Sequence, residues 1–140
     1  MVNILIVEDM AELREHARQV LAKVIETELN VQTASNGQEG MELALKTKPD
    51  LVVMDISMPE MNGIKAAEQI WQSKNDTKIL FWSQYHRETY VRSLGRIVPD
   101  DAIHGYLIKG ESDEKLEIAV RQVLLDGDPY IDPIVAGGQK

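Results

Sequence analysis

Five polar side chains directly follow short apolar runs in the sequence. They are Glu8, Asp9, Asp55, Ser83 and Lys109. Three carboxylates are suited to holding a hard divalent cation such as Mg²⁺, which prefers oxygen ligands and commonly keeps several waters. A hydroxyl and an ammonium group beside them are suited to binding a phosphoryl oxygen. These residue types therefore indicate metal-assisted chemistry on a phosphate, provided that the fold brings them together.

The apolar runs alternate with segments of helical periodicity. The expected strands lie within 4–7, 31–34, 51–54, 79–82 and 105–108, and the expected helices within 13–24, 41–45, 64–71, 90–97 and 116–124. This alternation is typical of right-handed βαβ crossovers, and five repeats are too few for an eight-stranded barrel. We therefore predict an α/β fold with a doubly wound, five-stranded parallel sheet, (βα)5. It is of the flavodoxin-like kind, with strand order 2-1-3-4-5.

The predicted strand order brings two of the acidic residues close together. Ligands of such sheets bind beyond the carboxyl ends of the strands, and the first and third strands are neighbours there. Asp9 and Asp55 would then lie about one strand spacing, ~4.8 Å, apart. Two unit charges about 5 Å apart repel by about 3 kcal/mol at an effective dielectric near 20. A bound cation would remove this repulsion, but two simpler interpretations remain open: the acids decorate polar loops, or Asp9 caps the first helix.

The combination resembles the receiver domain of two-component response regulators. The resemblance is carried by Ile-Leu-Ile-Val-Glu-Asp at 4–9, Val-Met-Asp-Ile-Ser-Met-Pro-Glu-Met-Asn-Gly at 53–63, Ser83, and Gly-Tyr-Leu-Ile-Lys at 105–109. It spans residues 3–126, and the acidic strand end followed by Met-Pro and then Gly is its most specific part. The resemblance implies that Asp55 is the nucleophile and phosphoacceptor.

The resemblance also implies a role for each of the other site residues. Glu8, Asp9 and Asp55 would hold Mg²⁺ together with the backbone carbonyl of Ser57. Ser83 and Lys109 would bind the phosphoryl group. Tyr106 would be an aromatic switch that turns inward when the serine moves, and so changes the surface formed by the fourth helix, the fifth strand and the fifth helix.

The family resemblance implies a phosphodonor and an output. The donor would be a histidine kinase or a histidine phosphotransfer protein. The domain would not be an enzyme in its own right, although it would supply catalytic groups for its own phosphorylation and dephosphorylation. The segments 110–112 and 127–133 resemble receivers that precede a helix-turn-helix DNA-binding domain. We therefore expect a receiver at 1–127, a linker or C-terminal tail at 128–140, and control of transcription through an output domain missing from this chain.

Several alternatives remain open at this point. The chain could be a standalone receiver acting through protein–protein contacts, or a homodimer formed through the surface of the fourth helix, fifth strand and fifth helix or through the first and fifth helices. An Mg²⁺-dependent aspartyl-phosphate hydrolase would need a second carboxylate where Ala11 stands. A flavodoxin-like cofactor binder would need a hydroxyl- and glycine-rich loop in place of Glu8 and Asp9.

The amino-acid composition excludes or disfavours several further classes of protein. The chain has 140 residues, enough for one domain, and its net charge of -8 makes it a poor nucleic-acid binder by itself, so DNA would be reached only through the output domain. It has no cysteine, which excludes disulfides and is compatible with the reducing cytoplasm. No apolar run approaches the ~18 residues of a membrane span, so no membrane association is expected. His16, His86 and His104 show no metal-ligand spacing.

Overall fold

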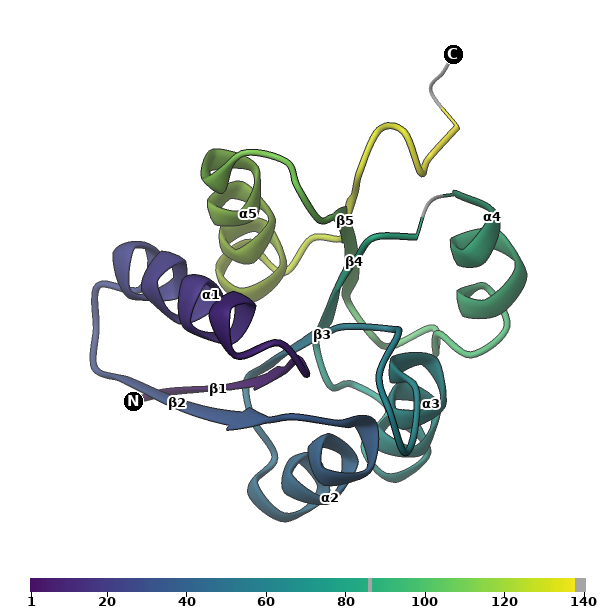
Figure 1. Ribbon diagram of the computed structural model, residues 1–140, viewed down its shortest axis with the longest axis horizontal. Helices are drawn as coiled ribbons and strands as arrows, with labels where there is room; N and C mark the ends of the chain where they lie inside the picture. The colour runs from purple at the N-terminus through teal and green to yellow at the C-terminus, as the bar shows by residue number, and fades with distance from the viewer. Residues whose placement is uncertain (86, 138–140) are drawn as a thin grey trace.

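The computed structural model describes residues 1–85 and 87–137, which form a parallel sheet with helices on both faces (Figure 1). The strands are β1 (Val2–Val7), β2 (Leu29–Ala34), β3 (Leu51–Met54), β4 (Ile79–Ser83), β5 (His104–Ile108) and β6 (Tyr130–Ile131). The helices are α1 (Ala11–Val24), α2 (Gly37–Thr47), α3 (Gly63–Ser73), α4 (Arg87–Thr89) and α5 (Asp113–Val120). Two π-helical turns, η1 (Tyr90–Leu94) and η2 (Arg121–Asp126), continue α4 and α5. The strand order is β2-β1-β3-β4-β5-β6.

The sheet separates two apolar cores. Along β1, Ile4 and Ile6 face one core whereas Leu5 and Val7 face the other, and all four are buried. This is why the central strands read as continuous apolar runs rather than as an alternating pattern. Helices α1 and α5 cover the first face, while α2, α3 and the α4–η1 segment cover the second (Figure 1).

Short polar side chains begin three of the helices. Asn36, Asn62 and Ser112 each accept a hydrogen bond from the backbone N–H three residues further on, which satisfies one of the free donors of the first turn. The helical segment η2 ends at Asp126, and the next residue, Gly127, has a left-handed φ of 70°. Glycine adopts this conformation without strain, so the chain can turn back toward the sheet there.

The predicted fold class and the order of the first five strands are confirmed, with two differences in detail. A sixth strand, β6, pairs in parallel with β5. The expected helix within 90–97 is instead the short α4 followed by the π-helical η1, which ends at Leu94, so Ile97 lies in a turn. Among the described residues, no helix has both the length and the apolar character needed to cross a bilayer.

Candidate functional site

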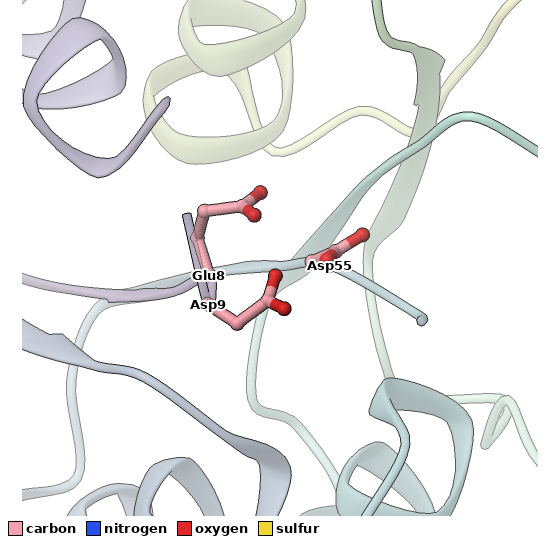
Figure 2. A group of neighbouring side chains, drawn as sticks. All are labelled: Glu8, Asp9 and Asp55. Atoms are coloured by element: carbon pink, nitrogen blue, oxygen red, sulfur yellow. The ribbon is translucent and has the colours of Figure 1, made fainter. Parts of the chain in front are cut away.

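The site lies where β1 and β3 end side by side. Their pairing extends to Val7 and Met54, and the N–H of Asp55 donates to the carbonyl of Val7 at 2.9 Å. This register brings Glu8, Asp9 and Asp55 to one edge of the sheet, where one oxygen from each carboxylate lies within 4.8 Å of the others. Figure 2 shows the three carboxylates gathered around a common space. The predicted proximity of Asp9 and Asp55 is confirmed.

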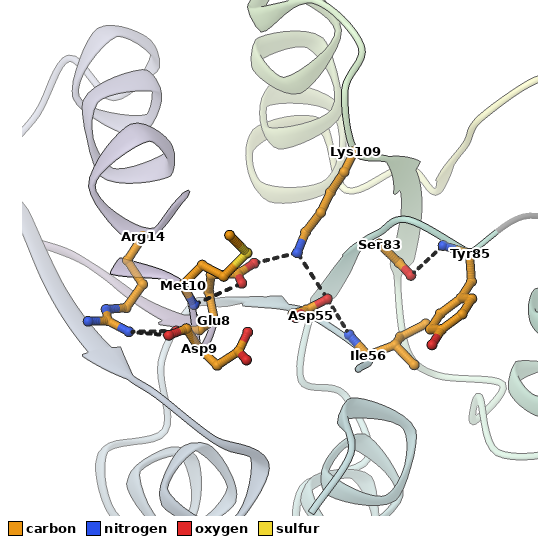
Figure 3. Close-up of polar contacts among 9 residues, drawn as sticks. All are labelled: Glu8, Asp9, Met10, Arg14, Asp55, Ile56, Ser83, Tyr85 and Lys109. Carbon is orange, nitrogen blue, oxygen red and sulfur yellow. Dashed lines mark hydrogen bonds and ion pairs between the residues drawn. The ribbon is translucent and has the colours of Figure 1, made fainter. Parts of the chain in front are cut away.

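Lys109 connects two of these carboxylates. It follows β5, and its N–H donates to the carbonyl of Ser83, which fixes its backbone beside the end of β4. Its Nζ lies 2.6 Å from Glu8 Oε1 and 3.1 Å from Asp55 Oδ1 (Figure 3). The same ammonium sits 5.4 Å from the centroid of the Trp82 ring, a cation–π distance. The lysine is therefore held over the acidic cluster rather than free in solvent.

Burial makes the two innermost carboxyls unfavourable as anions. Glu8 is 1% exposed and Asp55 5%. Burial is the main cause that raises the pKa of Glu8, and the charge of Asp55 adds to it, although the hydrogen bond and charge of Lys109 lower it. Burial likewise raises the pKa of Asp55 above its ordinary value, against the lowering effect of Lys109 and of the Ile56 N–H. The positive charge of Lys109 therefore does not compensate the negative charges of the carboxylates, and an additional positive charge would be stabilised at this site.

Asp9 is the exposed member of the cluster, and it does not cap a helix. Helix α1 has Met10 at its N-cap, and the Met10 side chain makes no capping hydrogen bond. Instead, Arg14 reaches back and its Nη1 donates to the carbonyls of Glu8 and Asp9, at 2.9 and 3.3 Å. The Met10 N–H donates to Glu8 Oε2 at 3.2 Å. These bonds hold the loop so that Asp9 stays beside Asp55, and a donor set made only of carboxylate oxygens fits Mg²⁺.

The loop after Asp55 is shaped by Gly63. The Gly63 N–H donates to the carbonyl of Ile56 at 2.8 Å, and a Cβ at this position would lie 1.9 Å from the carbonyl oxygen of Asp55. Only glycine lets the start of α3 come this close to the strand end. The Ile56 N–H also donates to Asp55 Oδ1 at 2.8 Å, which orients that carboxylate. Ser57 follows in the same loop with an exposed side chain.

Ser83 and Tyr106 form a second layer beside the carboxylates. Ser83 is buried at the end of β4, and its Oγ accepts a hydrogen bond from the Tyr85 N–H at 3.0 Å (Figure 3). Tyr106 is 0% exposed, and its hydroxyl donates to the Tyr85 carbonyl at 2.8 Å. The rings of Phe81 and Tyr90 pack against it at 6.3 and 5.3 Å between centroids. The tyrosine therefore already points inward in this structure.

Comparison with known proteins agrees with this geometry. The family model described as "Response regulator receiver domain" matches residues 4–121, most of the chain. The chain belongs to the response regulator receiver domain family.

Two curated relatives of this receiver are named as regulatory proteins. It is 34% identical over 134 residues to the transcriptional regulatory protein DegU of Brevibacillus brevis, covering 96% of this chain and 54% of that one. It is 36% identical over 132 residues to the oxygen regulatory protein NreC of Staphylococcus carnosus (strain TM300), covering 94% and 58% respectively. The receiver thus spans somewhat more than half the length of these relatives.

Solved structures show the same fold. A DNA-binding response regulator of the LuxR family from Staphylococcus aureus is 26% identical with a TM-score of 0.71, covering 88% of this chain and 98% of that one. A LuxR-family two-component response regulator from Aurantimonas sp. SI85-9A1 has a TM-score of 0.83 at 24% identity, covering 97% and 93% respectively. The second likeness concerns the fold alone.

The receiver's site contains contacts that sequence patterns did not reveal. No spacing in the sequence marks Arg14, a helical arginine, as part of the site. Trp82 precedes Ser83 directly, but the sequence favours simple packing within the strand for it. Their roles follow only from the position of α1 and β4 beside Lys109 and the acidic loop. His86 lies outside the described residues.

Proposed function

We propose that this receiver accepts a phosphoryl group on Asp55. The observation that carries the proposal is the ion pair between Asp55 and Lys109, at 3.1 Å, inside a cluster of three carboxylates. A carboxylate held beside an ammonium, with further acids ready for a cation, is the arrangement that phosphoryl transfer needs. That reaction depends mostly on positioning and on neutralising the charge of the transferred group.

The proposed transfer is a substitution at phosphorus. One oxygen of Asp55 forms a bond to phosphorus, and the bond from phosphorus to a histidine nitrogen of the donor breaks with its electron pair staying on the imidazole. The product is an acyl phosphate, which water can later hydrolyse. Lys109, already beside Asp55, would pair with a phosphoryl oxygen. Ser83 Oγ would donate to another.

Glu8, Asp9 and Asp55, with the backbone carbonyl of Ser57, are the residues that would hold Mg²⁺. When bound, the ion would supply positive charge in addition to that of Lys109 and so would stabilise the phosphoryl oxygens. Glu8 presents its Oε2 to the Met10 N–H and its Oε1 to Lys109, so the protein orients this carboxylate without the ion. The chain acts as a signalling domain, supplying these groups for its own phosphorylation and dephosphorylation.

The proposed response begins at Ser83. Phosphorylation adds about two negative charges and three acceptor oxygens, which would draw the Ser83 hydroxyl away from the Tyr85 N–H. Because Tyr106 bonds to the Tyr85 carbonyl, a change at Tyr85 reaches the aromatic ring and with it the surface of α4, β5 and α5. Tyr106 would then be favoured inward in the phosphorylated state.

The names of the relatives support a transcriptional output. We propose that residues 1–127 form the receiver, that 128–140 lead toward a DNA-binding domain, and that a histidine kinase or histidine phosphotransfer protein in the cytoplasm is the donor. A homodimer through α4, β5 and α5, or through α1 and α5, would convey the signal to that domain. The second candidate is a standalone receiver whose switched surface binds another protein.

Intact mass after incubation with acetyl phosphate and Mg²⁺ tests the phosphoacceptor. We expect one added phosphoryl group, formed as the phosphorus–oxygen bond of the donor breaks and acetate leaves. The addition should be absent in Asp55→Asn and in the presence of EDTA. The exposed Asp101→Asn is the matched control and should be phosphorylated like the wild type. An unchanged mass of the folded wild-type protein would refute the proposal, and repeated release of phosphate from a phosphomonoester would favour a hydrolase instead.

A further inference from the structure

The chain beyond Gly127 lies along the outer edge of the sheet rather than away from it. We call residues 128–136 the C-terminal segment; it leaves η2 and runs beside β5 (Figure 1, yellow). Within it, β6 pairs in parallel with β5, with Tyr130 opposite Gly105 and Ile131 opposite Tyr106. The Asp132 N–H then donates to the carbonyl of Tyr106 at 2.9 Å. The segment thus occupies hydrogen-bonding groups of the strand that carries the aromatic switch.

Two side chains anchor the C-terminal segment. Asp132 is 0% exposed, and its carboxylate accepts hydrogen bonds from the Ile134 N–H at 3.1 Å and the Ile108 N–H at 3.5 Å. Val135 is 1% exposed and belongs to the same apolar core as Tyr106. Their neighbour Ile134 is 56% exposed. A buried carboxylate with backbone donors and a buried apolar anchor indicate a built docking site, because a loose tail would leave both in water.

The C-terminal segment borders the ring of Tyr106. Register partners on adjacent parallel strands point to the same face of a sheet and lie ~4.8 Å apart. Ile131 therefore stands beside Tyr106, on the face that also carries Val135. With Phe81 and Tyr90 packed against the ring, these residues close the sheet edge past which the tyrosine would swing outward.

We propose that the C-terminal segment is an intramolecular latch on the β5 edge, which favours the inward position of Tyr106 and docks more tightly when Asp55 is phosphorylated. The second half of this statement rests on the proposed function. Coupling between two sites is reciprocal at equilibrium. A phosphoryl group that favours inward Tyr106 therefore also favours the docked latch, and loosening the latch lowers the stability of the phosphorylated state relative to the unphosphorylated one. While the latch is docked, the β5 edge is closed to any other strand.

Hydrogen exchange read by mass spectrometry tests the latch on the full chain. Exchange is followed in peptides covering 128–136 and 104–108, with and without acetyl phosphate and Mg²⁺, while intact mass reports the fraction phosphorylated. We expect phosphorylation to slow exchange in 128–136 by about five-fold or more. Val135→Ala should speed exchange in both peptides and lower the fraction phosphorylated. Ile134→Ala, the exposed neighbour, should behave like the wild type.

The possible results distinguish a failure of the latch proposal from a failure of the phosphoacceptor proposal. A phosphorylated protein whose 128–136 peptide exchanges at an unchanged or faster rate overturns the latch and leaves the phosphoacceptor standing. The latch is also overturned if Val135→Ala speeds exchange only in the 128–136 peptide and changes neither the exchange of the 104–108 peptide nor the fraction phosphorylated. A wild-type protein that gains no phosphoryl group overturns both proposals. Exchange in α3 serves as the folding control and should be the same in every variant.

Discussion

At the scale of single residues, the site has an unequal balance of charge. Glu8 and Asp55 are buried, yet Lys109 is the cation placed between them. Burial raises the pKa of both carboxyls in spite of that lysine, and the charge of Asp55 adds to the rise at Glu8 while the charge of Asp9 adds to the rise at Asp55. The positive charge of Lys109 thus does not compensate the negative charge of the carboxylates, and phosphorylation would add still more negative charge. We therefore expect Lys109 to contribute to stability as well as to the proposed chemistry.

Replacing Lys109 with methionine should destabilise the protein in a pH-dependent way. Two buried carboxylates would lose their shared partner, and breaking a buried ion pair by removing one member costs roughly 3 kcal/mol or more. The carboxyl pKa values, already above their ordinary 4.5 and 3.8, should rise further. Between the ordinary and the raised pKa values, the native state of the variant then binds more protons than the unfolded state. Its free energy of unfolding therefore falls as the pH rises through that range and is regained on acidification. Urea unfolding in EDTA at pH 7 and pH 5 measures the difference.

The exposed Lys65 provides the matched control for that substitution. Its side chain is 56% exposed and pairs with Glu68 on the surface of α3. Lys65→Met should change the free energy of unfolding by about 0.5 kcal/mol or less, because exposed ion pairs contribute little. If Lys109→Met lost the same stability at both pH values, the missing cation–π contact with Trp82 would account for the loss instead of the carboxylates.

At the scale of elements, the close approach of α3 to the end of β3 sets the position of Asp55. Gly63→Ala should lower the free energy of unfolding by about 3 kcal/mol, because its Cβ would meet the Asp55 carbonyl oxygen at 1.9 Å and neither backbone can yield freely. Phosphorylation should fall as well, since the strain acts on Asp55 itself. Thermal unfolding and intact mass measure the two effects.

Gly95 is the control for the glycine substitution. It lies just after η1 with ordinary helical angles, and an added Cβ there would meet only the Val91 carbonyl, at 3.5 Å. Gly95→Ala should therefore be neutral or stabilising by about 0.5 kcal/mol. Equal effects of the two substitutions would show that Gly63 is not constrained by the strand end.

The same elements show how much of the fold and of the site could be predicted from the sequence. Strands β1, β3, β4 and β5 are largely buried and follow from short apolar runs, whereas β2 is mostly half-buried or exposed and its sequence signal is weak. The strand ends identify Asp9, Asp55 and Lys109, because a strand boundary is a local signal. The sixth strand could not be predicted, because Tyr130 and Ile131 are a pair of residues between prolines whose pairing depends on the distant β5. The end of the fourth helix was also missed, since apolar spacing continues to Ile97 although η1 ends at Leu94.

At the scale of the whole molecule, the acidic cluster belongs to a strongly acidic protein. The net charge is -8, so repulsion from the rest of the surface adds to the local repulsion among Glu8, Asp9 and Asp55. Two explanations of any stabilisation by Mg²⁺ therefore have to be separated. General screening would act on all charges and depend only on ionic strength, whereas a bound ion would act through the cluster.

Mg²⁺ should raise the stability of this receiver well beyond the effect of matched NaCl. A ligand that binds only the native state stabilises it by about 2.7 kcal/mol at one hundred times its dissociation constant. Thermal unfolding across a Mg²⁺ titration, with NaCl at equal ionic strength, measures this gain. Asp9→Asn should abolish it, since Asp9 is the exposed carboxylate through which solvent reaches the cluster, while Asp101→Asn should keep it. If NaCl matched Mg²⁺, or if Asp9→Asn kept the full gain, screening of the molecule's overall charge would explain the stabilisation and the three carboxylates would not form a metal site.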